Sequence, residues 1–84
     1  MNKIRIFYSD SYEKNIIGLI HCYENNDDIE YEVYKKSNNG LNRLDLNGNH
    51  SYKSSTTDEN VIQYIDSYTK EYFENCHFKD IVMK

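Results

Sequence analysis

The sequence predicts an α+β domain, a small antiparallel β-meander of four to five strands packed against one long C-terminal helix. Two patterns carry this prediction. Residues 29–36 alternate apolar and polar side chains, as a half-buried strand does, and residues 56–76 repeat apolar side chains at helical spacing. The chain has 84 residues, no Pro and three isolated Gly. Residues 1–84 are therefore expected to form a single domain without linkers.

The N-terminal part is predicted to be strands, with one ambiguous segment. Residues 3–9 alternate as a strand does. Residues 15–24 are rich in side chains that prefer strands, and Gly18 would cost a helix interior about 1 kcal/mol relative to Ala. An apolar stripe beginning at Tyr12 is compatible with a helix instead. We favour the strand; the alternative is two helices on a three- to four-stranded sheet.

Residues 29–36 form the clearest predicted strand. The preceding acidic segment, residues 24–28, is expected to close a hairpin with residues 15–24. After the strand, residues 37–40 predict a turn, in which the Asn39-Gly40 pair is the standard signal of a two-residue hairpin. The side chains expected on one face are Ile29, Tyr31 and Val33, and those expected on the other are Glu30, Glu32 and Tyr34.

Three weaker strand candidates follow. Residues 41–46 form a short one, and residues 47–49 predict a turn. Residues 50–55 give a possible fourth or fifth strand with Tyr52 pointing inward. Residues 78–84 alternate imperfectly and are expected to return to the sheet as an edge strand.

The helix at residues 56–76 is supported by its start and by its apolar stripe. Thr56 and Glu59 stand three residues apart, as in a capping box. No Gly or Pro interrupts the segment. The stripe expected to face the sheet consists of Val61, Ile65, Tyr68 and Tyr72, with Tyr64 and Phe73 at its borders.

Composition excludes several classes of partner. The net charge is −4, from 14 acidic and 10 basic side chains, which argues against direct nucleic-acid binding because phosphates require a basic patch. No apolar run approaches the ~18 residues that span a bilayer, and the N-terminus lacks signal-peptide features. We therefore expect a cytoplasmic protein that does not contact membranes, with Cys22 and Cys76 as reduced thiols.

The sequence offers weak candidates for chemistry. His21-Cys22 and Cys76-His77 supply the residue types of a Cys2His2 zinc site. Neighbouring residues on a strand point to opposite faces, and zinc ligands normally stand two to four residues apart, so these pairs are not expected to converge on an ion. The negative end of the helix dipole also disfavours a nucleophilic thiolate near Cys76. We expect no catalytic residue, no metal and no cofactor.

The most prominent charge feature is an acidic segment beside an aromatic ring. Five acids occur within nine residues, with no base between them, and Glu30 and Glu32 are expected about 6.8 Å apart on one face. Such a surface either is simply solvated or docks on a Lys/Arg-rich groove. The helix is expected to add acids on or near its outer side, at Asp58, Asp66, Glu71 and Glu74. The residues predicted to bind a partner are Asp27, Asp28, Glu30, Glu32, Tyr34, Glu71 and Glu74, with the outer helix face around Lys70 as the second place to look.

In style the chain resembles the small acidic inhibitors carried by phages, above all anti-CRISPR proteins. The resemblance lies in composition and in the order of residues 16–36, a predicted hairpin, and residues 58–75, the predicted helix. It implies a non-enzymatic inhibitor that occupies the nucleic-acid groove of a bacterial protein, most of all a CRISPR effector nuclease. The alternative is another phage accessory protein, such as an immunity protein, antitoxin or assembly factor. The resemblance assigns no residue roles.

Overall fold

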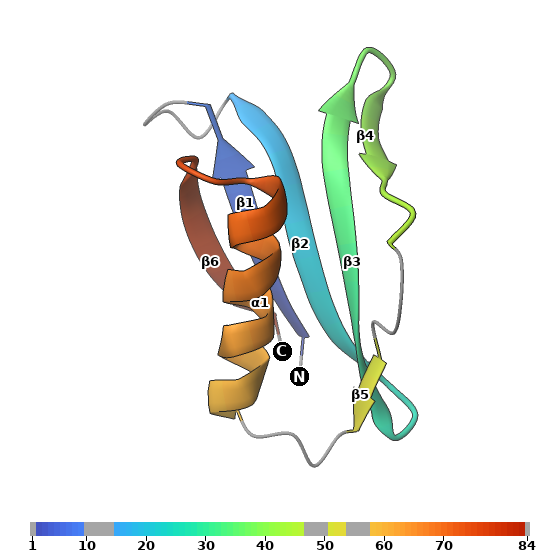
Figure 1. Cartoon of the computed structure of the whole chain (residues 1–84). Coiled ribbons are helices and arrows are strands. Elements are labelled where there is room, and N and C mark those ends of the chain that lie inside the picture. Colours follow the sequence, from blue (N-terminus) through green and yellow to red (C-terminus); the bar gives the residue numbers. More distant parts are fainter. Residues whose placement is uncertain (1, 10–14, 47–50, 54–57, 84) are drawn as a thin grey trace.

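Across the residues that the structure describes, the chain forms a six-stranded antiparallel sheet with one helix on one face (Figure 1). This computed structural model describes residues 2–9, 15–46, 51–53 and 58–83, and at 51–53 and 58 only the backbone. The elements are β1 (Asn2–Tyr8), β2 (Ile16–Asn25), β3 (Asp28–Ser37), β4 (Gly40–Arg43), β5 (Ser51–Lys53), α1 (Asp58–Tyr72) and β6 (His77–Met83). The strand order is β4-β3-β2-β1-β6, and β5 also pairs with β3.

The predicted α+β class is confirmed, but two details of the architecture were wrong. The helix is not C-terminal, because β6 follows it and pairs antiparallel with β1 at the edge of the sheet. The strands number six rather than four to five, and β5 pairs with β3 instead of continuing the meander from β4. The expectation that the last segment returns as an edge strand is confirmed.

The ambiguous segment is a strand, so the alternative with a helix at residues 15–24 is wrong. β2 pairs with β3 in the register Asn25 opposite Asp28, which leaves Asn26 and Asp27 as the hairpin turn. Asn26 has φ 57°, a conformation that Asn tolerates better than most residues. The predicted hairpin, in which the acidic residues 24–28 join two strands, is therefore confirmed.

The second hairpin turn forms at residues 37–40 as predicted, but its two central residues lie one position before the predicted Asn39-Gly40 pair. Ser37 pairs with Gly40, so the two turn residues are Asn38 and Asn39, and Gly40 is the first residue of β4. Gly40 has φ +105°, which L side chains rarely adopt. The glycine supplies this conformation just after the turn, as in hairpins that close with a bulge. The predicted turn at residues 47–49 lies outside the described residues.

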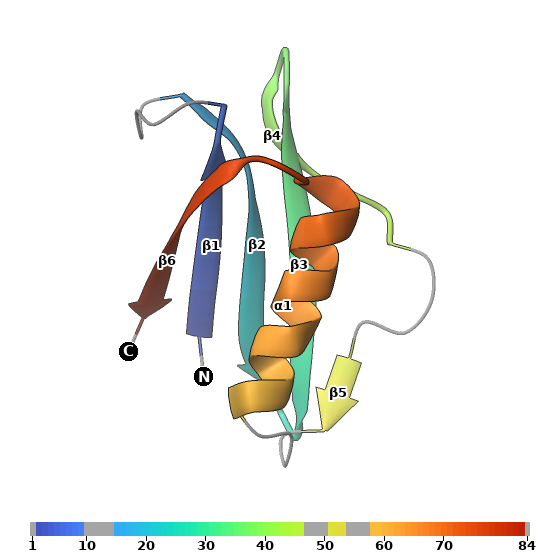
Figure 2. The same cartoon turned by 60° about the vertical axis from the view of Figure 1, so that its left-hand side comes forward.

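The core lies between α1 and the face of the sheet that it covers (Figure 2). The predicted alternation of β3 is confirmed, because its apolar side chains point to α1 and its acids point away. Full burial of each large apolar side chain contributes about 1.5–3 kcal/mol. The buried cluster consists of Phe7, Ile20, Cys22, Ile29, Tyr31, Val33, Val61, Ile65 and Phe73.

The helix is shorter than predicted, and its C-terminal end packs differently. It spans Asp58–Tyr72, whereas Thr56, the predicted cap, lies outside the described residues. Asn75 has φ 64°, a left-handed conformation typical of residues that follow a helix. Phe73, predicted at the border of the stripe, is 2% exposed and stacks on Phe7 with ring centroids 4.0 Å apart. Of the predicted stripe, Val61 and Ile65 are buried, and Tyr68 and Tyr72 are half-buried.

Gly18 allows this packing of Phe73 against the sheet. A Cβ at position 18 would collide with the Phe73 ring and would lie 2.5 Å from the carbonyl oxygen of Tyr34. Gly18, which argued against a helix at residues 15–24, is therefore a site of close approach between β2 and the C-terminal end of α1.

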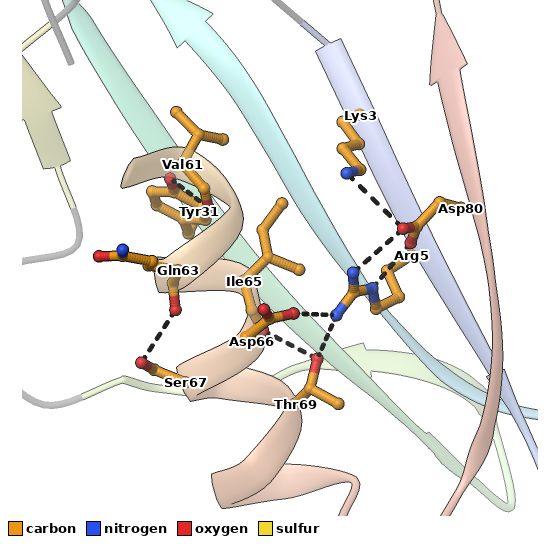
Figure 3. A network of polar contacts seen from close by, with 10 residues as sticks. All are labelled: Lys3, Arg5, Tyr31, Val61, Gln63, Ile65, Asp66, Ser67, Thr69 and Asp80. Atoms are coloured by element: carbon orange, nitrogen blue, oxygen red, sulfur yellow. Dashed lines mark hydrogen bonds and ion pairs between the residues drawn. The ribbon is translucent and has the colours of Figure 1, made fainter. Parts of the chain in front are cut away.

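A buried arginine ties α1 and β6 to β1 (Figure 3). Arg5 is 5% exposed and donates two hydrogen bonds to Asp80 on β6, at 2.7 and 3.0 Å. Its Nη1 also donates to Asp66 at 2.7 Å and to Thr69 at 3.2 Å, both on α1. Asp66, predicted on the outer side of the helix, thus turns one oxygen towards the sheet. We call Arg5, Asp66, Thr69 and Asp80 the Arg5 cluster.

Candidate protein-interaction surface

The face of the sheet turned away from α1, here called the open face, has no described helix or strand over it (Figure 2). Alternation along the strands places apolar, aromatic and acidic side chains there side by side. Each is only half-buried. These side chains are Ile4, Ile6, Leu19, His21, Tyr23, Glu30, Glu32 and Tyr34.

Glu32 is held by bases from two other strands. Its Oε2 accepts a hydrogen bond from Arg43 Nη1 at 3.0 Å, and its Oε1 lies 3.4 Å from His21 Nδ1. Partial burial by itself would raise the pKa of Glu32, but the hydrogen bonds with Arg43 and His21 outweigh it and lower that pKa. The acidic segment contains no basic residue, but β4 pairs with β3 and places Arg43 against Glu32. Glu32 is therefore not the uncompensated charge that the run of acids without an intervening base indicated.

Two tyrosines flank these acids. Burial, and then the hydrogen bond with Glu30, raise the pKa of Tyr23 to about 12. Burial, and then the charge of Glu32, raise the pKa of Tyr34. Both rings therefore stay neutral in the physiological range, where their hydroxyls can hydrogen-bond and their faces can pack.

A shallow cavity of about 490 Å³ lies where the chain leaves the sheet after β4. Leu44 N donates to Val33 O at 2.8 Å and is followed by residues without strand pairing. The cavity has aromatic and aliphatic walls and carries three carboxylates against one guanidinium. We call it the acidic cleft; its lining residues are Tyr23, Glu30, Tyr31, Glu32, Arg43, Leu44, Asp45 and Leu46.

The structure divides the predicted partner-binding residues into separate groups. Glu30 and Glu32 line the acidic cleft, and Tyr34 lies beside Glu32 on the open face. Asp27 and Asp28 are exposed in and beside the β2–β3 turn. Glu71 and Glu74, like Lys70, are exposed on or just after α1, which lies on the other face of the sheet. One surface containing all seven predicted residues is therefore not formed.

Several cleft residues were missed by the sequence reasoning. Arg43, Leu44, Asp45 and Leu46 belong to a segment interpreted only as a weak strand, and no motif marks them. Tyr23 could have been predicted from the sequence, because a hairpin with Asn25 opposite Asp28 places Tyr23 directly opposite Glu30.

The two cysteines lie apart from this surface, whereas His21 belongs to it. Cys22 is fully buried in the core, and burial raises the pKa of its thiol. His21, on the opposite face, places Nε2 2.6 Å from Asn2 Oδ1. Cys22 and Cys76 are free thiols. Within the described residues, no three His, Cys, Asp or Glu side chains gather as a metal site.

No protein-family model matches the chain, and comparisons with curated proteins and with solved structures returned no match. In the described part of the chain, the helix is too short and too polar to cross a bilayer.

Proposed function

We propose that this chain is a non-enzymatic inhibitor that binds a bacterial nucleic-acid-handling protein through its acidic cleft and the adjoining open face. The partner offers a basic groove, and occupation of that groove blocks nucleic acid. A CRISPR effector nuclease is the partner class we propose, in line with the resemblance to anti-CRISPR proteins. The acidic cleft is the single observation that carries the proposal.

The composition of the cleft suits a long basic side chain. Leu44, Leu46 and the tyrosine rings offer apolar contact for the methylenes of Lys or Arg, which commonly bury their stems while keeping the charged head polar. Glu30 and Asp45 add negative charge that Arg43 alone does not balance, because Arg43 already donates to Glu32. A guanidinium from the partner would therefore meet acceptors and ring faces together.

The surroundings of the cleft favour rapid encounter with a basic surface. Asp27 and Asp28 are exposed at the end of the β2–β3 hairpin and extend the negative field beyond the cleft. Tyr34 and the half-buried apolar side chains of the open face then add contact area near the charge. Inhibition of this kind needs one molecule of this protein for each molecule of the partner and no chemical step.

The test is charge reversal that spares the fold. Glu32→Lys is unsuitable, because the new ammonium would face Arg43. Glu30→Lys combined with Asp45→Lys reverses the cleft and leaves the Glu32–Arg43 pair in place. The matched control is Glu71→Lys with Glu74→Lys, which makes the same change in net charge on exposed sites elsewhere.

The measurement is inhibition of DNA cleavage by a panel of RNA-guided nucleases at equimolar protein, with association rates at low and high salt. We expect the cleft variant to associate about tenfold or more slowly and to lose most of its salt dependence, with little change in the control. Equal losses in both variants would show that the acidic cleft is not the specific docking site. Tight binding to a partner that leaves cleavage intact would instead favour the immunity, antitoxin or assembly alternative.

A further inference from the structure

β6 is an edge strand with an unusually apolar exposed surface. All seven of its residues are exposed, and it forms the end of the sheet opposite β4 among the described strands. Four of the six exposed large apolar side chains in the described part of the chain belong to it. Phe78 and Val82 are 48% and 70% exposed, and Ile81 and Met83 are each 37% exposed. Edge strands of this kind readily accept another strand.

The charges of β6 also distinguish it from the rest of the surface. It carries one Lys and one Asp, so it is formally neutral in a chain of net charge −4. Asp80 is held by both hydrogen bonds from Arg5, and Lys3 Nζ lies 3.6 Å from the same carboxylate. A second copy of this acidic protein would be repelled at the β2–β3 turn, but not at β6.

We infer that β6 pairs antiparallel with β6 of a second copy, with the two-fold axis passing beside Asp80. A two-fold axis perpendicular to the sheet keeps both copies of α1 on the same face, so opposed residues must lie on the same face of the strand. Centring the axis on Asp80 places Phe78 of each copy opposite Val82 of the other. The two most exposed apolar side chains of β6 then cover each other twice.

This register also suits the open face. Lys79 of each copy lies opposite Ile81 of the other, and His77 lies opposite Met83. Centring the axis on Lys79 would instead juxtapose two ammonium groups. The two Asp80 side chains at the proposed centre are each already paired with Arg5 and Lys3 of their own copy. The resulting dimer keeps both acidic clefts on the same face of one continuous sheet, at its two far ends.

The first test is the oligomeric state of the full chain. Sedimentation velocity across a dilution series reaching on the order of 100 μM should show a reversible monomer–dimer equilibrium. Val82→Glu should raise the dimer Kd about tenfold or more, because the axis places each substitution in the interface twice. The monomer should stay folded, because residue 82 lies opposite Lys3 on β1.

The matched control is Leu41→Glu on β4. Leu41 is 42% exposed and also lies opposite a lysine, Lys36, within its own sheet. This variant should dimerise as the wild type does, with circular dichroism confirming that both variants are folded. A wild-type monomer throughout the series, or equal weakening by both substitutions, would overturn the proposal.

A second pair of variants tests the register. Ile81→Glu would face Lys79 of the second copy, whereas Ile81→Lys would place two ammonium groups together. The glutamate variant should therefore dimerise several-fold more tightly than the lysine variant, with the difference shrinking at high salt. Equal dimer Kd values for these two folded variants would exclude the Asp80-centred pairing.

Discussion

The two faces of β3 differ in what covers them: α1 packs on one, and no described helix or strand lies over the other. On the covered face, Ile29 and Val33 are 2% and 0% exposed beneath α1. On the open face, Glu30 and Glu32 are half-buried among side chains that no described helix or strand covers. The covered face stabilises the fold through apolar burial, whereas the open face leaves polar and aromatic side chains only half-buried.

Each face also has an arginine–carboxylate cluster, and the two clusters differ in how far the arginine is buried. The Arg5 side chain is 6% exposed and joins three elements through Asp80, Asp66 and Thr69. The Arg43 side chain is 67% exposed and joins only two adjacent strands through Glu32. Ion pairs at exposed sites typically contribute about 0–1 kcal/mol. The same pair of groups is therefore buried and links three elements on one face, whereas on the other it is largely exposed and links two strands.

The largest expected effect is a difference in stability between alanine substitutions at two isoleucines of α1. Ile65→Ala should lower the free energy of unfolding by about 2–5 kcal/mol, because Ile65 is 1% exposed in the core. Ile62→Ala on the same helix should change it by less than about 0.5 kcal/mol, because Ile62 is 42% exposed. Urea denaturation of both variants measures the difference. A loss below about 1 kcal/mol for Ile65→Ala would mean that the α1 stripe does not form the core.

The next comparison sets the two ion-pair clusters against each other. Asp80→Asn should destabilise the fold at neutral pH by about 1–2 kcal/mol, and Glu32→Gln by less than about 1 kcal/mol. Hydrogen bonds from Arg5 hold the pKa of Asp80 below its ordinary 3.8. Its folded-state pKa is depressed, so its stabilising contribution is present above pH 3.8 and is lost as pH falls through the folded value.

Acid denaturation followed by circular dichroism measures this effect. The stability of Asp80→Asn should depend less on pH below 3.8 than that of the wild type. The Glu32→Gln variant is the control on the open face. If it flattens the acid profile more than Asp80→Asn does, the Arg5 cluster is not the stronger of the two.

The smallest effect concerns a tyrosine of the open face. Tyr23 should ionise near pH 12 in the folded protein, and Glu30→Gln should move this value part of the way towards the ordinary 10.0, because burial remains. The folded state favours the neutral phenol of Tyr23. The contribution of Tyr23 to stability is therefore present below pH 10.0 and is lost as pH rises to about 12. Carbon-13 spectra of labelled tyrosine, with Tyr23→Phe for assignment, follow the titration. Ionisation of Tyr23 at the ordinary value would contradict its burial against Glu30.

The sequence by itself determined where apolar side chains repeat at strand spacing and where they repeat at helix spacing. Alternation in residues 29–36 assigned Ile29 and Glu30 to opposite faces, and helical spacing assigned Val61 and Ile65 to the core. Such patterns are readable because each depends only on residues a few positions apart. The turn at residues 37–40 was also predicted from sequence, but its central pair, which depends on exact backbone geometry, lies one position before the predicted Asn39-Gly40.

Only the tertiary structure decided which side chains meet. Arg5 and Asp80 are 75 residues apart, and Arg43 and Glu32 are 11 apart on paired strands, so no local pattern joins them. Their contacts follow from strand order and register, which bring β6 beside β1 and β4 beside β3. A one-residue shift of register would turn these side chains to the other face. The compensation of Glu32 and the acidic cleft therefore come from the folded sheet, because each joins segments that lie apart in the sequence.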